Sequence, residues 1–506
     1  MKRRNTLLGG ALMLTAVNLL LRFGSTAFQV WLSSRIGAAG IGLLQLILSV
    51  NMLALTLGAA GGRTTAMYLT AEALGKGKPA DADRMLHGCL IYCIIAAGAV
   101  SMGLYCFSPT LANCWIGSGE ALSALRTWAT FLPVVCVTGV MTGYFTAARR
   151  IGTLAAVEVA EQVFSICVTA FVLVRISPAD RAGACRAVVL GTCLGSVLSL
   201  ICLMYLYASR STGGESDIPT AKPILKCAVP LAVADDLKAG ISALENLMVP
   251  RRLTLYYGTS DPLAAFGRVS GMIFPVMMLP AAILSSLAEV LIPELARCRA
   301  VGSRTRIRYL VRRNLRAALV YGLCCGGLLF LLSDAICARF YPGEDIAPNL
   351  RRFAILVPML YCDLISDAMT KGLGQQAACA RYSIISNVLD VSLMFFLLPW
   401  LGMEGYYLSF ALTHAVNFLL GLRKILSISG VRLDFSSSLL MMACAAFSIF
   451  GGTCFTGILR RSAAYLGLFF GLSFYLGILG KGDIRWLRSL IFRSRKQADI
   501  ADATNS

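Results

Sequence analysis

The stretch AAFGRVSGMIFPVMMLPAAILSSLAEVLIPEL, residues 264–295, is a long apolar run with very few charges. About 20 apolar residues are enough for a helix to cross the hydrocarbon core of a bilayer. Pro275, Pro280 and Pro293 lie inside the run, and each removes a backbone hydrogen bond and favours a kink. We therefore expect a broken transmembrane helix here.

The composition extends this expectation to the whole chain. Its 506 residues are 57% hydrophobic and only 14% charged, with a mean hydropathy of +0.72. Soluble domains usually carry about 25% charged residues. This chain has more apolar surface than one water-soluble core can bury, so we predict an all-α polytopic membrane protein.

Similar apolar runs recur from one end of the chain to the other. The first begins MKRRN and resembles a signal peptide, but the many spans after it predict an uncleaved first helix. We expect about fourteen transmembrane helices, at 7–32, 38–71, 85–108, 121–147, 151–175, 184–208, 223–249, 263–296, 309–333, 350–373, 378–401, 404–427, 436–458 and 462–480.

The chain repeats its own spacing. When the sequence is shifted so that Gly42 falls on Gly267, the second to sixth runs coincide with the eighth to twelfth without a gap. The same shift places Met52 on Met277 and Pro133 on Pro358. Because six helices return the chain to the same side, we expect two parallel, pseudo-symmetric lobes with a site between them.

The repeat sets the expected domain boundaries. They are an N-lobe of helices one to six at 1–210, a cytoplasmic linker at 211–222, a C-lobe of helices seven to twelve at 223–428, two extra helices at 429–482 and a basic cytoplasmic tail at 483–506.

The net charge of +20 indicates topology and not a nucleic-acid partner. Most Lys and Arg residues fall in short connections on one predicted side, which places both termini in the cytoplasm. The densest basic cluster, at 297–316, would face the anionic inner leaflet. We expect a multi-pass protein of the bacterial cytoplasmic membrane.

No residue pattern points to a metal, a cofactor or an enzyme. The 18 cysteines form no C-x-x-C pair and lie mostly in apolar runs, and there are only two histidines. His414 is alone in its predicted helix, and no loop is long enough for a catalytic domain. Coupling to Na+, H+ or the membrane potential is left open.

Four arginines are candidate substrate ligands. Arg22 and Arg63 lie inside predicted spans, where a charge costs at least about 2.5 kcal/mol. Arg251 and Arg252 follow helix seven in LENLMVPRRL, residues 244–253. Arginine binds phosphate and carboxylate oxygens with a rigid fork, so the set indicates an anionic substrate in a wet cavity between the lobes. Structural pairing, for example of Arg251 and Arg252 with Asp261 or Glu245, is the alternative.

Helix seven also carries candidate coupling or gating residues. They are Asp235, Asp236, Lys238, Glu245 and Asn246, of which Asp235 and Lys238 are spaced to pair with each other. Candidate hinges are Pro250, expected to end helix seven, and Pro275, Pro280 and Pro293 of helix eight. Gly58, Gly61 and Gly62 are expected to loosen the matching part of helix two.

LENLMVPRRL, the stretch at 264–295 and SSRIGAAGIGLLQ at 33–45 together resemble the stage V sporulation protein B group. That group belongs to the multidrug/oligosaccharidyl-lipid/polysaccharide exporter superfamily and is related to peptidoglycan lipid flippases. The resemblance implies a two-lobed flippase that moves undecaprenyl-pyrophosphate-linked sugars through a cationic cavity, with Arg22 near the family's basic position in helix one. By analogy it also implies spore-cortex or cell-wall synthesis.

Two other functions stay open at this point. One is a cation-coupled multidrug antiporter of the same superfamily, and the other is a non-transporting scaffold for wall synthesis. For the flippase we expect a monomer with a lipid-linked anionic glycan and membrane lipids as partners, and contacts with cell-wall synthesis proteins are left open.

Overall fold

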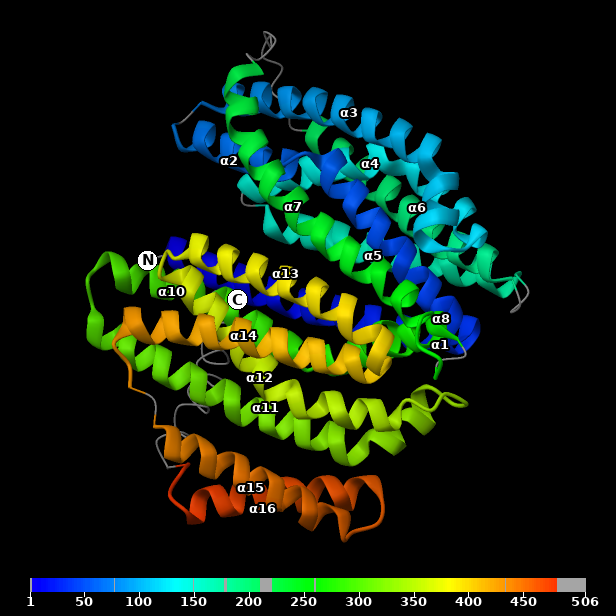
Figure 1. The fold of residues 1–506 in the computed structure, drawn as a ribbon. Helices are drawn as coiled ribbons and strands as arrows, with labels where there is room; N and C mark the ends of the chain where they lie inside the picture. Colours follow the sequence, from blue (N-terminus) through cyan, green and yellow to red (C-terminus); the bar gives the residue numbers. More distant parts are fainter. Residues whose placement is uncertain are drawn as a thin grey trace, which may run out of the picture. The chain divides into compact units, whose positions relative to one another are not determined.

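The structure, a computed structural model, describes residues 2–76, 78–148, 150–176, 180–209, 221–258, 261–432 and 434–479. These ranges contain helices and no strand, which confirms the all-α fold (Figure 1). Most of the predicted linker at 211–222 and all of the predicted tail at 483–506 lie outside the described residues.

The helices follow the fourteen predicted runs in order. Those of the first half are α1 (Lys2–Ala59), α2 (Gly62–Gly75), α3 (Pro79–Thr110), α4 (Leu122–Ala147), α5 (Ile151–Val174) and α6 (Arg181–Ala208). Those of the second half are α7 (Ala221–Leu253), α8 (Pro262–Gly267), α9 (Phe274–Met278), α10 (Ala281–Ala300), α11 (Arg304–Phe340), α12 (Ala347–Gly372), α13 (Gln376–Leu401), α14 (Met403–Ser429), α15 (Phe435–Thr453) and α16 (Ile458–Tyr475). Short π-helical turns at Leu111–Ile116 and Arg268–Ile273 and a 3₁₀ turn at Gly119–Ala121 complete the described elements.

Ten of these helical segments are long and apolar enough to cross a membrane, and the bent α8–α10 segment raises the number to eleven within the described ranges. One of the ten, Leu19–Gly75, spans 57 residues and changes direction at Gly37, which has φ 69° and ψ 175°. It therefore supplies the first two predicted spans. The charges on α7 explain why that helix fails the same test.

Two contact-defined units make up the chain. The first contains residues 16–272 and 390–406, and the second contains 1–15, 273–389 and 407–506. In the first unit α7 packs against α2 and α3. The lobe boundaries expected from the repeat remain a prediction, because these units are grouped by contacts and not by the repeat.

The same packing pattern occurs once in each unit. In the first unit α2, α3 and α4 contact one another pairwise, and in the second α10, α11 and α12 do the same (Figure 1). Arg126 Nε donates to Ser108 Oγ at 3.4 Å in the first set. In the second set Arg351 Nε donates to Ser333 Oγ at 2.8 Å, and both residues are the repeat equivalents of the first pair. The pseudo-symmetry predicted from the sequence is therefore present in the hydrogen bonds as well as in the helix order.

A close helix crossing in the first unit involves one of the matched glycine pairs. A Cβ added to Gly42 would lie 2.2 Å from the carbonyl oxygen of Leu263, and one added to Gly267 would lie 2.0 Å from that of Ala38. Ala38 and Leu263 are themselves matched by the repeat, so the two contacts are reciprocal. Only glycine permits this approach, because any side chain would overlap backbone atoms of the facing helix.

Helix two of the prediction is interrupted where its glycines lie. Ala60 and Gly61 have φ values of 45° and 71°, so α1 ends at Ala59 and α2 begins at Gly62. A Cβ on Gly61 would lie 2.7 Å from the carbonyl oxygen of Ala228 on α7. The break expected there is confirmed, and α7 crosses directly over it.

The proline-rich helix eight is also broken as expected. It divides into α8, a π-turn, α9 and α10, and it bends by 60° at the break between Met278 and Ala281, where Pro280 stands. Pro275 lies in the first turn of α9, and Pro293 is inside α10 without ending it.

The expectation that Pro250 ends helix seven was wrong, since α7 continues to Leu253. A proline inside a helix removes one amide donor and favours a kink, but it does not have to end the helix, and α7 also contains Pro230. The Thr254 amide still bonds to the Pro250 carbonyl at 3.2 Å, so the last turn of α7 stays closed.

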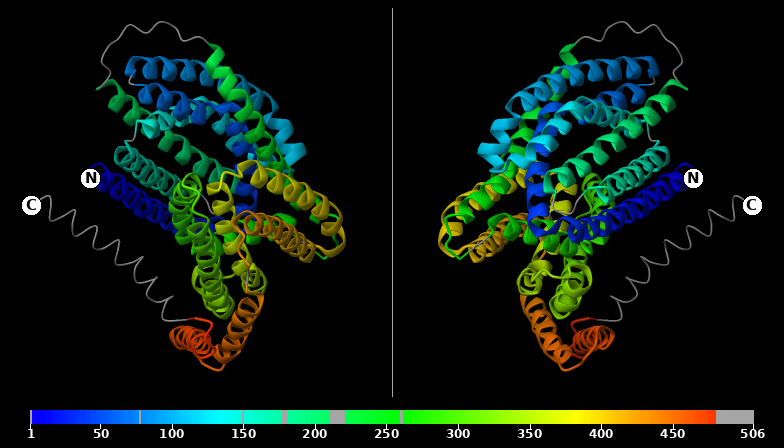
Figure 2. Two further views of the ribbon diagram at one scale, coloured as in Figure 1. Left: turned by 90° about the vertical axis from the view of Figure 1, so that its left-hand side faces the viewer. Right: turned by 90° about the vertical axis from the view of Figure 1, so that its right-hand side faces the viewer.

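The last two helices form a hairpin within the second unit and pack on α11 (Figure 2). Met441, Cys444 and Phe469 form a buried core with Leu323 of α11. The buried Tyr465 hydroxyl donates to the Leu323 carbonyl at 2.7 Å. Gly327 has no side chain, and a Cβ there would lie 2.1 Å from the Tyr465 oxygen. The hairpin is therefore held to this part of α11.

Candidate functional site

The two arginines predicted inside spans are both exposed. Arg22 lies in α1 before the turn at Gly37, and Arg63 lies in the first turn of α2 directly after the break. A Cβ on Gly143 of α4 would lie 2.4 Å from the Arg63 carbonyl oxygen, so α4 packs closely on the backbone of Arg63. The Arg63 charge also acts on Glu158 of α5. The cavity between lobes in which both were expected to lie remains a prediction.

Arg251 and Arg252 occupy the last turn of α7 and behave differently from each other. Arg251 is exposed. Arg252 donates through Nε and Nη2 to the carbonyl oxygen of Phe395 at 3.0 and 2.7 Å, and its guanidinium lies 3.6 Å from the centre of the Phe395 ring. This contact ties the end of α7 to α13.

The alternative partners considered for these arginines have other contacts. Asp261 caps α8 by accepting from the Ala264 amide at 2.9 Å. Glu245 is hydrogen-bonded to Asp390. No ion pair joins Arg251 or Arg252 to either acid in the described part of the chain, so the gate-locking pairing is not observed.

Glu245 is part of a buried acid pair. Its carboxyl group is hydrogen-bonded to that of Asp390 on α13, and Asp390 is only 5% exposed. Tyr406, 4% exposed, lies close enough for both carboxyl groups to act on it. The carboxyl groups of Glu245 and Asp390 therefore lie next to each other on facing helices, α7 and α13.

The other charges of α7 are more open. Asp235 and Lys238 are exposed, and no ion pair within 4 Å joins them in the described residues. Asp236 is half-buried near Tyr92 of α3, and one of its carboxylate oxygens is buried without a hydrogen-bond partner. Asn246 is half-buried beside Glu245. The expected pairing of Asp235 with Lys238 is therefore not observed in the described residues.

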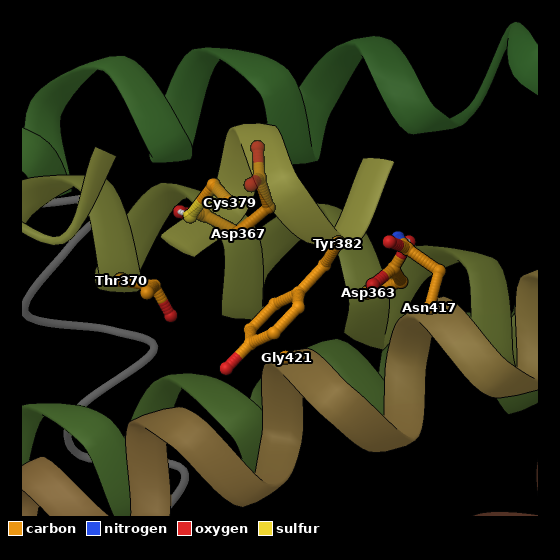
Figure 3. Close-up of a pocket in the computed structure, with 7 residues that line it drawn as sticks. All are labelled: Asp363, Asp367, Thr370, Cys379, Tyr382, Asn417 and Gly421. Atoms are coloured by element: carbon orange, nitrogen blue, oxygen red, sulfur yellow. Dashed lines mark hydrogen bonds between the residues drawn. The ribbon is translucent and has the colours of Figure 1, made fainter. Parts of the chain in front are cut away.

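A second acidic site lies in the second unit, between α12, α13 and α14. Asn417 donates through Nδ2 to Asp363 Oδ2 at 2.9 Å (Figure 3). The pair borders a hollow of about 10 Å³ that Tyr382 and Gly421 also line. That volume is close to the minimum for one water molecule. Asp367 lines the same hollow and pairs with Lys371 at 2.5 Å.

Sequence reasoning identified Glu245 but not its partners. Asp390 was visible as an acid inside a predicted span, but nothing in the sequence connects it with a residue four predicted runs away along the chain. Tyr406 carried no signal, since a tyrosine in an apolar run is ordinary. Among the described residues no group of three or more His, Cys, Asp or Glu side chains could hold a metal ion.

Residues 7–299 match the family described as polysaccharide biosynthesis protein. This match covers more than half of the chain. The chain belongs to the polysaccharide biosynthesis protein family.

Curated relatives agree with this family. The chain is 22% identical over 418 residues to stage V sporulation protein B of Bacillus subtilis (strain 168), which covers 79% of this chain and 80% of the relative. It is also 22% identical over 282 residues to sporulation protein YkvU of the same organism, covering 53% of this chain and 61% of the relative. The predicted resemblance to the stage V sporulation protein B group is confirmed.

Solved structures of two transporter types share the fold. The lipid II flippase MurJ in an inward closed conformation matches with a TM-score of 0.68 and 13% identity over 92% of this chain and 99% of that one. An inward-facing multidrug resistance MATE family transporter of the MOP superfamily matches with a TM-score of 0.66 and 15% identity over 83% and 100%. The family member described here therefore has the membrane-transporter fold that both structures share.

Proposed function

We propose that this family member translocates an undecaprenyl-pyrophosphate-linked saccharide across the bacterial cytoplasmic membrane by alternating access. The observation that carries the proposal is the exposure of Arg22 and Arg63 within membrane-length apolar helices. An exposed guanidinium in hydrocarbon is costly, so these side chains require water or an anionic group beside them. A pyrophosphate supplies that anion, and arginine binds its oxygens in a bidentate manner.

The rest of the transport cycle follows from this assignment. The lipid tail stays in the bilayer while the head group passes through a hydrated cavity, with Arg251 at its outer mouth and Arg252 anchoring that mouth to α13. The breaks at Ala60–Gly61 and at Pro280, with Pro275 and Pro293 flanking the latter, are the proposed hinges. The protein acts as a monomer with both termini in the cytoplasm, and it serves spore-cortex or wall synthesis as a transporter and not as an enzyme.

Transport of a fluorescent undecaprenyl-pyrophosphate-linked saccharide in proteoliposomes tests the proposal. Removing a charge-assisted contact of about 1.5–3 kcal/mol is expected to lower transport about tenfold or more in Arg22→Gln and in Arg63→Gln. Arg35→Gln is the matched control, because Arg35 is exposed near the Gly37 turn, lies 5.8 Å from the Trp31 ring and loses the same charge. Unchanged transport in both Arg22→Gln and Arg63→Gln would show that these arginines have a structural role and do not bind the substrate.

The second candidate function is cation-coupled export of small molecules, and the Glu245–Asp390 pair favours it. Two adjacent carboxyl groups inside a transporter can bind a proton and a cationic drug in turn. Efflux of a cationic dye from proteoliposomes, driven by an imposed pH gradient, separates the two functions. If the wild type exports the dye but does not transport the saccharide, and Glu245→Gln abolishes dye efflux, the export function replaces the flippase proposal. If the wild type shows neither activity, the scaffold function is the one left.

A further inference from the structure

The second unit contains a cavity of about 240 Å³ between α11, α14 and the first half of α15. The hairpin packs tightly on α11 around Leu323, Gly327 and Leu331, and the cavity lies beside these contacts at the beginning of α15. The walls are mostly apolar and include Leu315, Leu319, Phe418, Leu422 and Leu439. We call this cavity the wedge; two of its lining residues, Leu319 and Met441, also belong to the packed core beside Leu323.

The wedge has two cationic side chains in its wall. Arg312 and Arg316 line it from successive turns of α11, one side chain above the other. Leu315 lies between these two arginines along α11, and Leu319 follows in the next turn toward Leu323. The cavity therefore combines two cationic side chains with mostly apolar walls.

One acid stands at this rim, and its contacts are already used within its own helix end. Asp434 accepts from Ser436 Oγ at 2.8 Å and from the Ser437 amide at 3.3 Å, and so caps α15. Hydrogen bonds from Ser436 and Ser437, with Arg312 and Arg316 nearby, lower the pKa of Asp434 below its usual range. The cap orients the first turn of α15 and leaves the rim with an excess of positive charge.

The surrounding segment adds to that excess. Residues 304–316 contribute further arginines, and the sequence places this end of α11 at the cytoplasmic leaflet. Several neighbours have structural bonds: Arg306 pairs with Glu294 at 2.7 Å, and Arg308 donates to the Ser429 carbonyl at 3.3 Å. Arg312 and Arg316 are the two that line the cavity.

We propose that this wedge is a binding site for an anionic phospholipid of the cytoplasmic leaflet, with its phosphate at Arg312 and Arg316 and one acyl chain between α11, α14 and α15. The cavity has the polarity of a lipid, because two arginines line it beside mostly apolar walls. The bound lipid fills the gap at the base of the hairpin and fixes α15 against the second unit. The site is independent of the transported substrate.

Retention of dioleoyl-phosphatidylglycerol by the purified full-length protein, counted by native mass spectrometry, tests the site. Retention of dioleoyl-phosphatidylglycerol is measured as a ratio to retention of dioleoyl-phosphatidylcholine. The double variant Arg312→Gln with Arg316→Gln is expected to lower this ratio about tenfold to thirtyfold, because each basic residue contributes to the attraction of the anionic head group. Arg304→Gln with Arg381→Gln removes the same charge outside the cavity and is expected to keep retention near the wild-type value. Leu439→Trp enlarges an apolar residue of the cavity wall without changing charge and is expected to lower retention as well.

Three results would overturn the proposal. One is equal retention in the Arg312/Arg316 variant and its control. Another is unaltered retention in Leu439→Trp, which would show that the acyl chain lies elsewhere. The third is retention of undecaprenyl pyrophosphate in preference to phosphatidylglycerol, which would make the wedge part of the substrate path. None of these readouts depends on transport activity.

Discussion

The two repeats use the same helical scaffold but carry different polar side chains, hydroxyl or carboxyl, at equivalent positions. Thr138, Thr142 and Ser165 in the first repeat correspond to Asp363, Asp367 and Asp390 in the second. In the first repeat Thr138 donates to the carbonyl oxygens of Val134 and Ser196 at 2.9 and 3.2 Å. A hydroxyl satisfied by backbone stabilises a helix contact and does not titrate, whereas an aspartate can carry a proton.

The exchange also runs the other way. Glu161 of the first repeat, which accepts from Ser196 Oγ at 3.0 Å, corresponds to Ser386 of the second. The two repeats therefore share a helix arrangement but carry their acidic side chains at different positions. Pseudo-symmetry fixes the packing of the helices, and departures from it mark where the chemistry of the two repeats differs.

The largest expected effect tests the shared scaffold. Gly42→Leu and Gly267→Leu each force a side chain onto facing backbone, and we expect a loss of about 3 kcal/mol or more, at or beyond the upper end of ordinary overpacking. The two variants should lose similar amounts of stability because their contacts are reciprocal. Size-exclusion profiles and thermal unfolding of the purified protein measure this.

Gly98→Ala is the control for that prediction, since nothing lies within 4 Å of an added Cβ there. It should be neutral or more stable by up to about 1 kcal/mol. If either Gly42→Leu or Gly267→Leu were tolerated while the other was not, the crossing would not be symmetric.

A smaller effect is expected where the repeats differ. Glu245→Gln or Asp390→Asn replaces one carboxyl group of the adjacent pair with an amide, and we expect transport to fall about tenfold. Glu161→Gln makes the same chemical change in the first repeat and should lower transport less than about threefold, because Ser196 can bond to the amide. Initial rates across a pH series in proteoliposomes check this, and equal losses in Glu161→Gln would contradict a special role for the second repeat.

The smallest effect concerns a contact that both repeats keep. Arg126→Gln should lower the free energy of unfolding by about 1 kcal/mol, and Arg351→Gln by about 2 kcal/mol. The difference is expected because Arg351 also pairs with Asp334, whereas Arg126 lies 5.3 Å from the Tyr105 ring. Thermal melting of the two single variants measures the order, and a larger loss in Arg126→Gln would contradict it.

Most of the fold was predictable from the sequence because a bilayer imposes simple requirements. A helix must satisfy its own backbone and present about 20 apolar residues, so runs, breaks and order could be read directly. The repeat was detectable because both halves meet the same spacing. The end of α7 was misplaced because a proline signals a helix boundary only on average, and α7 continues through both Pro230 and Pro250.

The site was less predictable. The apolar runs, the charge asymmetry and the repeat register are sufficient to establish a polytopic, pseudo-symmetric membrane protein with unusual charges on α1, α2 and α7. Tertiary packing was needed to show that Glu245 faces Asp390, that Arg252 is bound to Phe395, and that Gly42 meets the second repeat. The reason is that helix formation depends on neighbours along the chain, whereas the partner of a charge depends on how helices far apart in sequence are rotated and packed.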